Sequence, residues 1–117
     1  MKKDEPLYPD ANLTLRVAYG KVEGYQPRDG VEYKHYTTLE GVMEKDDSDS
    51  YFYNIPGKLR ELYEARDFGI YEDSEGYMPV CFIASNHTTG GNSGSPIVNS
   101  KGQLIGVNFD RAWESTM

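Results

Sequence analysis

The most informative motif of the sequence is Gly90-Gly91-Asn92-Ser93-Gly94-Ser95-Pro96, which reads GGNSGSP and follows two threonines. Peptide hydrolysis through an acyl-enzyme requires a nucleophilic hydroxyl and hydrogen-bond donors for the developing oxyanion. A tight turn framed by glycines supplies both, because glycine adopts backbone conformations that are closed to other residues. Gly91 is expected to turn its N–H inward, beside the N–H of Ser93. We therefore predict Ser93 as the nucleophile and the Gly91 and Ser93 amides as the oxyanion hole.

Two other serines compete for the nucleophile role. Ser95 lies within the same motif, and Ser85 lies shortly before it. Ser93 is preferred because glycines flank it directly. The alternative is a Gly/Ser-rich turn without chemistry, and the strand before it and hairpin after it argue against that interpretation.

The segments around the motif predict strands. Residues 78–84 form an apolar run typical of a buried strand, and residues 96–99 and 103–109 flank the short turn Ser100-Lys101-Gly102. This last pattern predicts a β-hairpin. Residues 12–18 alternate between apolar and polar side chains, which predicts a half-buried strand, and residues 31–43 are expected to hold one or two more.

The remaining segments predict one helix and several loops. Residues 56–65 carry apolar side chains at helical spacing, with Pro56 expected at the first helical position and Gly69 as a stop shortly afterwards. The Pro27–Gly30 stretch (PRDG) predicts a turn, and the acidic run at residues 46–49 predicts a solvated loop. The sequence therefore predicts a mainly β fold with one inserted α-helix.

Composition excludes several classes of function. The chain has 117 residues and a net charge of −7, which argues against nucleic-acid binding because phosphate contacts require clustered cations. We expect no membrane insertion, because no apolar run approaches the roughly 20 residues that span a bilayer. The charged N-terminus does not resemble a signal peptide. No metal site and no cofactor are expected.

The motifs resemble those of the bacterial dipeptidyl-peptidase 7/11 family of trypsin-like serine peptidases. The resemblance covers nearly all of this chain but only the C-terminal portion of a family member. It is carried by these stretches: Tyr8-Pro9-Asp10-Ala11-Asn12, Thr14-Leu15-Arg16, Pro27-Arg28-Asp29-Gly30, Asp67-Phe68-Gly69, TTGGNSGSP and Gly106-Val107-Asn108-Phe109-Asp110-Arg111.

The resemblance implies the C-terminal half of a chymotrypsin-like double β-barrel. On this view residues 1–117 form one Greek-key-type barrel that carries the serine, while the partner barrel and a large helical domain lie elsewhere in a longer parent chain. The isolated chain is then expected to expose apolar surface meant for the missing barrel. The resemblance also implies a periplasmic or cell-surface location in bacteria, and it leaves a homodimer of the parent open.

The resemblance further implies the release of dipeptides from peptides with a free N-terminus. Asp110 matches an acidic residue that helps to hold the substrate's α-ammonium group, and Asn108 and Phe109 belong to the same substrate-binding segment. The next position lines the primary specificity pocket and is Gly in the dipeptidyl-peptidase 7 branch but Arg in the dipeptidyl-peptidase 11 branch. Arg111 therefore implies specificity for Asp or Glu in the second position.

Physical chemistry supports this role for Arg111. A guanidinium in a partly desolvated pocket pairs with a carboxylate in a bidentate fashion and so favours acidic over apolar side chains. In an extended segment the side chains of Asp110 and Arg111 point to opposite sides, so each can serve a different end of a dipeptide. The alternative is a surface arginine paired with Asp110 or Glu114.

A serine triad also needs a base that is oriented by an acid. His35 and His87 are both interpreted as structural or solvent-facing, and the base and acid are expected in the other barrel. The isolated chain should therefore be inactive. Two further hypotheses remain: a fragment of a glutamyl-type endopeptidase, and a non-catalytic module that binds acidic peptides.

Overall fold

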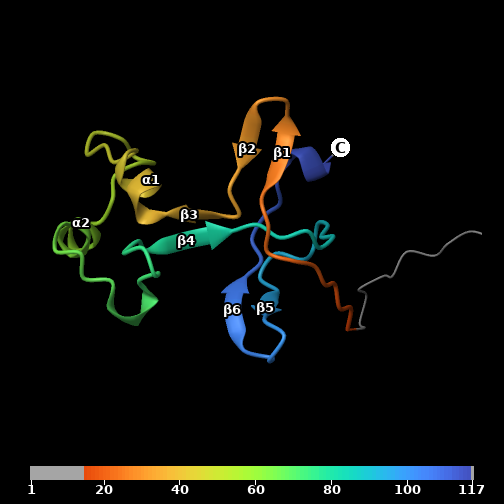
Figure 1. Ribbon diagram of the computed structural model, residues 1–117. Coiled ribbons are helices and arrows are strands. Elements are labelled where there is room, and N and C mark those ends of the chain that lie inside the picture. Colours follow the sequence, from red (N-terminus) through yellow and green to blue (C-terminus); the bar gives the residue numbers. More distant parts are fainter. Residues whose placement is uncertain (1–14, 117) are drawn as a thin grey trace, which may run out of the picture. The chain divides into compact units, whose positions relative to one another are not determined.

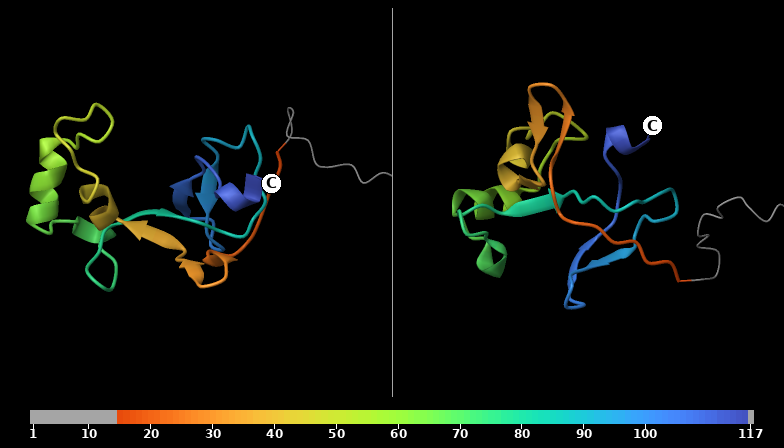
Figure 2. Two further views of the ribbon diagram at one scale, coloured as in Figure 1. Left: turned by 90° about the horizontal axis from the view of Figure 1, so that it is seen from above. Right: turned by 45° about the vertical axis from the view of Figure 1, so that its right-hand side comes forward.

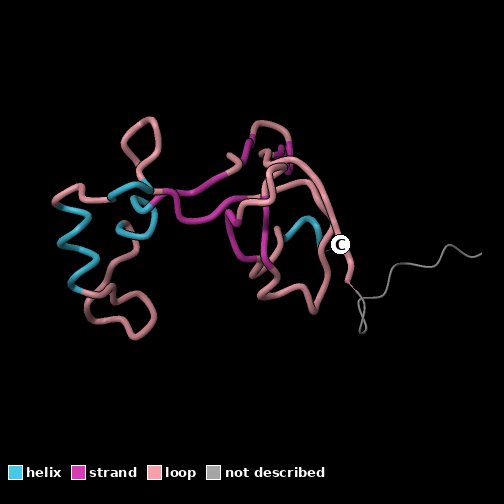
Figure 3. Tube along the Cα trace, turned by 90° about the horizontal axis from the view of Figure 1, so that it is seen from below, coloured by secondary structure: helices cyan, strands magenta, loops and turns pink. Residues whose placement is uncertain are grey.

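The computed structural model describes residues 15–116 (Figure 1). The chain divides into two compact units, each described here by itself. Among the described residues, the first comprises residues 15–21 and 85–110, and the second comprises residues 22–84 and 111–116. The strands are short, and long loops join them (Figure 3).

The first unit is built on the predicted hairpin. Strand β5 (Pro96–Val98) pairs with β6 (Leu104–Val107) in antiparallel register, with Ile97 opposite Gly106. Figure 2 shows the two strands side by side. The Asn99 side chain closes the turn, because its Oδ1 accepts hydrogen bonds from the N–H groups of Lys101 at 2.9 Å and Gln103 at 3.0 Å. The hairpin prediction is confirmed.

The second unit holds the other strands. Strand β1 (Tyr25–Arg28) pairs antiparallel with β2 (Val31–Tyr33) across the turn at residues 29–30, and β3 (Tyr36–Thr38) pairs antiparallel with β4 (Pro79–Phe82). The PRDG stretch therefore lies across the end of β1 and the turn of a hairpin. The strands expected within residues 31–43 are confirmed.

The helices differ from the expectation of one insert. Helix α2 (Gly57–Glu64) confirms the predicted helix, but a short α1 (Leu39–Met43) and two 3-10 turns, η1 (Gly69–Tyr71) and η2 (Trp113–Thr116), are present as well. Pro56 precedes the first helical residue instead of occupying it, because its ψ of 135° is extended. The fold of the described chain is mainly β, with small antiparallel sheets and few helices.

Helix α2 ends at Glu64, and the left-handed residue that terminates it is Arg66, not Gly69 as expected. Arg66 has a φ of 52°, and the N–H groups of Arg66 and Asp67 donate to the carbonyls of Tyr63 and Leu62, each at 3.0 Å. This bond pair is the Schellman arrangement, which usually places glycine at the left-handed position. The side chain explains why arginine is accepted there. Its guanidinium contacts Glu40 at 2.8 Å, the carbonyl of Gly76 at 2.6 Å and the Phe68 ring at 4.9 Å.

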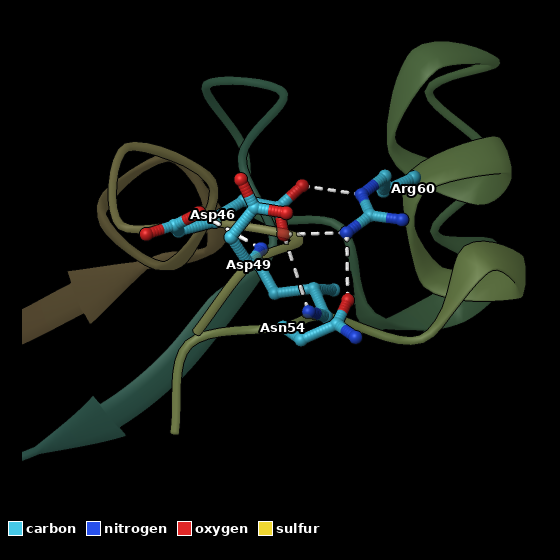
Figure 4. A network of polar contacts seen from close by, with 6 residues as sticks. Asp46, Asp49, Asn54 and Arg60 are labelled. Atoms are coloured by element: carbon cyan, nitrogen blue, oxygen red, sulfur yellow. Dashed lines mark hydrogen bonds and ion pairs between the residues drawn. The ribbon is translucent and has the colours of Figure 1, made fainter. Parts of the chain in front are cut away.

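The acidic run at residues 46–49 is not simply a solvated loop. The Asp46 carboxylate pairs with Arg60 of α2 and also accepts the N–H of Ile55 at 3.2 Å (Figure 4). The same guanidinium donates to Oδ1 of Asn54 at 3.2 Å. The Arg60 hydrogen bond holds the pKa of Asp46 below its usual value. A sequence pattern of consecutive acidic residues does not reveal a partner that lies on a later helix.

The apolar core of the described residues is small. Only Leu39, Ile55 and Phe68 are buried, all in the second unit. Two burial predictions are wrong. Strand β4 lies in the run that was predicted to be a buried strand, but half of Val80 is exposed. Leu15 and Val17 were expected in a half-buried strand, but they are 94% and 77% exposed, and residues 15–18 form no strand. Residues 12–14 of that predicted strand lie outside the described residues. A two-stranded sheet buries little apolar surface by itself, and Val98 and Leu104 of the β5–β6 hairpin are exposed. That such surface is meant for a missing barrel stays a prediction.

Within residues 15–116, none of the helices combines the length and the apolar character that crossing a bilayer requires.

Candidate active site

The serine loop, defined as residues 88–95, connects the chain after residue 87 to β5. Gly91 and Gly94 have φ values of 96° and 85°, a region that side-chain-bearing residues rarely adopt. These two glycines bracket Asn92 and Ser93. The special backbone conformation expected of Gly91 is present, the inward orientation of its N–H stays a prediction, and the left-handed conformation of Gly94 was not predicted. A Cβ atom added to Gly91 or to Gly94 would have no described atom within 4 Å. The backbone conformation alone therefore requires glycine in this chain.

The hairpin ladder continues into the serine loop through Asn108. Its N–H donates to the carbonyl of Ser95 at 2.8 Å, and its carbonyl accepts the N–H of Gly94 at 2.7 Å. Its side-chain nitrogen donates to the carbonyl of Asn92 at 3.1 Å. Asn108 was predicted to bind substrate. These bonds show in addition that it fixes the loop to the end of β6.

The side chain of Asn92 organises the other end of the loop. Its Oδ1 accepts the N–H of Thr89 at 2.7 Å and one guanidinium nitrogen of Arg16 at 3.0 Å. The N–H of Asn92 in turn donates to the carbonyl of Thr89 at 3.2 Å. The sequence prediction did not include Arg16 as a site residue, because it lies 76 positions before Asn92 and nothing in its local pattern indicates that contact.

Ser93 is exposed, and its hydroxyl makes only a long contact of 3.4 Å to the carbonyl of Phe109. Among residues 15–116, no hydrogen bond uses the N–H of Gly91 or of Ser93. An exposed hydroxyl in the same loop as two amide donors that no described group uses fits the requirements for acyl transfer, in which such donors serve an oxyanion that appears during the reaction. The oxyanion-hole assignment stays a prediction.

The rival serines have structural contacts. The hydroxyl of Ser85 accepts the N–H of Lys21 at 2.9 Å, and the N–H of Ser85 donates back to the carbonyl of Lys21 at 2.9 Å. Ser95 is half-buried, and its backbone groups are bonded to Asn92 and Asn108. Ser93 is the more accessible of the two serines in the motif.

The predicted substrate-binding segment follows β6. Phe109, Asp110 and Arg111 are all exposed, with Phe109 at 69%. Asp110 is the last residue of this stretch in the first unit, and Arg111 begins the final segment of the second. The roles of these residues and of Asn108 in substrate binding stay predictions.

The final segment of the second unit is tied to β1. The Tyr25 hydroxyl donates to the Glu114 carboxylate at 2.5 Å. This hydrogen bond raises the pKa of Tyr25 to about 12 and lowers the pKa of Glu114 below its usual value. Glu114 was considered as a partner of Arg111, and the structure shows Tyr25 as a partner of its carboxylate.

The histidines contribute no identified base. His35 lies at 4.8 Å from the ring of Tyr36, and both His35 and His87 are exposed, as expected of solvent-facing side chains. Among residues 15–116 no group of three or more His, Cys, Asp or Glu side chains is placed to hold a metal ion. That the triad base lies outside this chain stays a prediction.

A serine between left-handed glycines, directly before a β-hairpin, suits a hydrolase that forms an acyl-enzyme. Comparison with known proteins places the chain among the peptidases. Residues 1–117 match the family described as Peptidase S46, and the chain belongs to this family. The sequence-based recognition of the family is therefore confirmed.

Two curated relatives show the degree of similarity. An Asp/Glu-specific dipeptidyl-peptidase of Porphyromonas gingivalis is 59% identical over 114 residues, which is 97% of this chain and 16% of that protein. A dipeptidyl-peptidase 7 of Phocaeicola vulgatus is 56% identical over 115 residues, which is 98% of this chain and 16% of that protein. This chain therefore spans about one-sixth of the length of these relatives.

A solved structure agrees with the fold. The crystal structure of Porphyromonas endodontalis DPP11 in complex with the dipeptide Arg-Glu superimposes with a TM-score of 0.86 at 58% identity, covering 96% of this chain and 16% of that chain. The small antiparallel sheets described above are therefore similar in arrangement to part of a much longer peptidase.

Proposed function

We propose that this chain carries the nucleophile and the specificity residue of a serine dipeptidyl peptidase. The full-length parent would release N-terminal dipeptides that have Asp or Glu in the second position. Ser93 attacks the scissile carbonyl, and the Gly91 and Ser93 amides stabilise the oxyanion. The base and the acid of the triad come from the partner barrel of a chymotrypsin-like double barrel, of which residues 1–117 form one half. Without that base the chain alone is inactive.

The observation that carries the proposal is the exposed Ser93 hydroxyl between two glycines of positive φ, in a loop where the N–H groups of Gly91 and Ser93 have no hydrogen-bond partner among residues 15–116. The relatives support the kind of chemistry, since they are named as dipeptidyl-peptidases. Identity alone does not choose between the two substrate classes, because a relative of each name lies within 56–59%. Arg111 makes that choice, because a guanidinium favours a carboxylate over an apolar side chain.

The other end of the dipeptide is assigned to the residue before. Asp110 holds the α-ammonium group of the substrate, and Phe109 belongs to the same substrate-binding segment. This assignment explains a requirement for a free N-terminus, because a blocked amine carries no charge for Asp110 to bind. The solved relative in complex with Arg-Glu carries a dipeptide of the expected kind, with a free amine at one end and a glutamate in the second position.

The test uses the full-length parent and a fluorophosphonate that reacts with activated serines. Wild type and the matched control Ser95→Ala should be labelled, while Ser93→Ala should not. Wild-type parent that has not been treated with the reagent should cleave an unblocked peptide with Glu in the second position and leave the N-blocked peptide intact. Absence of labelling would support the non-catalytic module, and cleavage of the blocked peptide would support the endopeptidase.

Location is proposed from the family resemblance. We expect the parent in the periplasm or on the bacterial cell surface, where peptides from outside the cell are accessible. Cell fractionation with a cytoplasmic marker enzyme would test this, and recovery of the parent only with the marker would contradict it.

A further inference from the structure

The contact between Arg16 and Asn92 has no role in the chemistry assigned so far. Arg16 is half-buried, and one of its guanidinium nitrogens lies 3.0 Å from Oδ1 of Asn92. Both residues belong to the first unit, which also contains Ser93. A charged donor gives a stronger hydrogen bond than a neutral one, and its loss leaves the acceptor under-satisfied.

Asn92 is the residue through which this contact reaches the nucleophile. Its side-chain oxygen accepts the N–H of Thr89 at 2.7 Å, and its backbone carbonyl accepts the N–H of Ser95 at 3.0 Å. These bonds fix the loop on both sides of Ser93. Gly91 and Gly94, which flank this pair of residues, have positive φ, which glycine adopts without strain, so the surrounding contacts select this conformation from the others that glycine allows.

We propose that Arg16 is a positioning residue for the serine loop, acting through the side chain of Asn92. Arg16 does not contact the substrate in this scheme. Its guanidinium orients the Asn92 carboxamide so that the oxygen accepts both the Arg16 donor and the Thr89 N–H. The carboxamide then holds residues 91–94 in the conformation that presents the Ser93 hydroxyl and the two oxyanion amides. This inference rests on the proposed function only for its catalytic consequence.

The geometry makes a prediction about charge at position 92. A carboxylate has the same shape as the carboxamide and accepts the same donors, and it would pair more strongly with the guanidinium. Asn92→Asp should therefore function when Arg16 is present. In an Arg16→Met background the same carboxylate loses its cation, so the two substitutions together should cost more than the sum of each alone.

The experiment measures two quantities in the full-length parent. The first is the rate of fluorophosphonate labelling at Ser93, with kcat and KM for a dipeptidyl substrate. The second is the amide hydrogen exchange of residues 88–95. The variants are Arg16→Met, Arg16→Lys, Asn92→Asp and the double variant, with Arg28→Met as a control that removes an exposed arginine outside the loop.

Arg16→Met should lower both the labelling rate and kcat by about tenfold or more, as expected for a lost charged hydrogen bond, while KM changes by less than about twofold. Arg16→Lys should recover part of the loss, and Asn92→Asp should label at nearly the wild-type rate. Exchange of residues 88–95 should rise in Arg16→Met and stay unchanged in Arg28→Met.

The outcomes separate the two proposals. Wild type that resists labelling, together with faster exchange in Arg16→Met, would reject the nucleophile assignment and retain the positioning role. Labelling of wild type and Arg16→Met at equal rates, or additive effects in the double variant, would overturn the positioning role. If Arg16→Met fails to fold, Asn92→Asp alone tests the role: labelling at nearly the wild-type rate supports it, and a loss of about tenfold or more would overturn it.

Discussion

Replacing each glycine of the motif by alanine isolates the contribution of backbone conformation at the site. Gly90, Gly91 and Gly94 all have open space where a methyl group would lie, with no described atom within 4 Å. They differ in φ, which is 96° at Gly91 and 85° at Gly94 but not positive at Gly90. Gly90→Ala is therefore a matched control, since it adds the same atom at a neighbouring position without the conformational cost.

The expected magnitude follows from this comparison. An L-residue with a side chain pays about 1–2 kcal/mol in the left-handed region. If the loop must keep its conformation for Ser93 to react, that cost lowers the competent population by a factor of about 5–30. Gly91→Ala and Gly94→Ala should therefore lose about this factor in reactivity, and Gly90→Ala should lose little.

The assay is the second-order rate of fluorophosphonate labelling in the full-length parent, with the melting temperature as a check on folding. The reagent is small, so a new methyl group that blocks a peptide would affect peptide cleavage more than labelling. Equal losses in all three variants would show that added volume, and not φ, controls the site. No loss in Gly91→Ala or Gly94→Ala would refute the role of the left-handed backbone.

Three further outcomes are expected in the full-length parent. Arg111→Gly should change the ratio of kcat/KM for acidic over apolar second residues by about tenfold or more, since close charge pairs couple by about 1.5–7 kcal/mol; an unchanged ratio would remove Arg111 from the pocket. Spectrophotometric titration should give Tyr25 a pKa of about 12, and Glu114→Gln should return this pKa toward 10. The hydrogen bond should stabilise the fold fully at pH values below the pKa of Tyr25 in the unfolded chain, near 10. This stabilisation should disappear as the pH rises through 12. Arg60 lowers the pKa of Asp46 from its usual value of 3.8. The Asp46 carboxylate should therefore stabilise the fold at pH values above 3.8 and lose this effect as acid protonates it. The unfolding free energy of Asp46→Asn should depend less on pH below 3.8 than that of the wild type.

Local sequence patterns predicted the parts of the fold that depend on local chemistry. The hairpin at residues 96–107 and helix α2 follow from alternation, helical spacing and turn residues, which are read within a few positions. The left-handed conformation of Gly91 follows for the same reason. The family resemblance, carried by longer motifs, is confirmed as well.

Contacts between distant positions could not be predicted in this way. The bonds Arg16–Asn92 and Tyr25–Glu114 join residues 76 and 89 positions apart, and each donor looks like an ordinary exposed side chain in the sequence. Arg66 was missed as the left-handed residue that terminates α2, because only its distant partners, Glu40 and Gly76, make an arginine acceptable there. The exposure of Leu15 was missed because alternation predicts an apolar face but not what covers it.

The attachment of Asn108 to both sides of the serine loop has a consequence for how this family can change during evolution. Because side chains alternate along a strand, inserting or deleting a single residue between positions 99 and 103 would rotate β6 and carry Asn108 away from Asn92 and Ser95. Length variation in that turn should therefore be tolerated among homologues only when it leaves the pairing of Pro96 with Val107 intact. An alignment of functional members would then show indels at the tip of the hairpin that come with a compensating bulge.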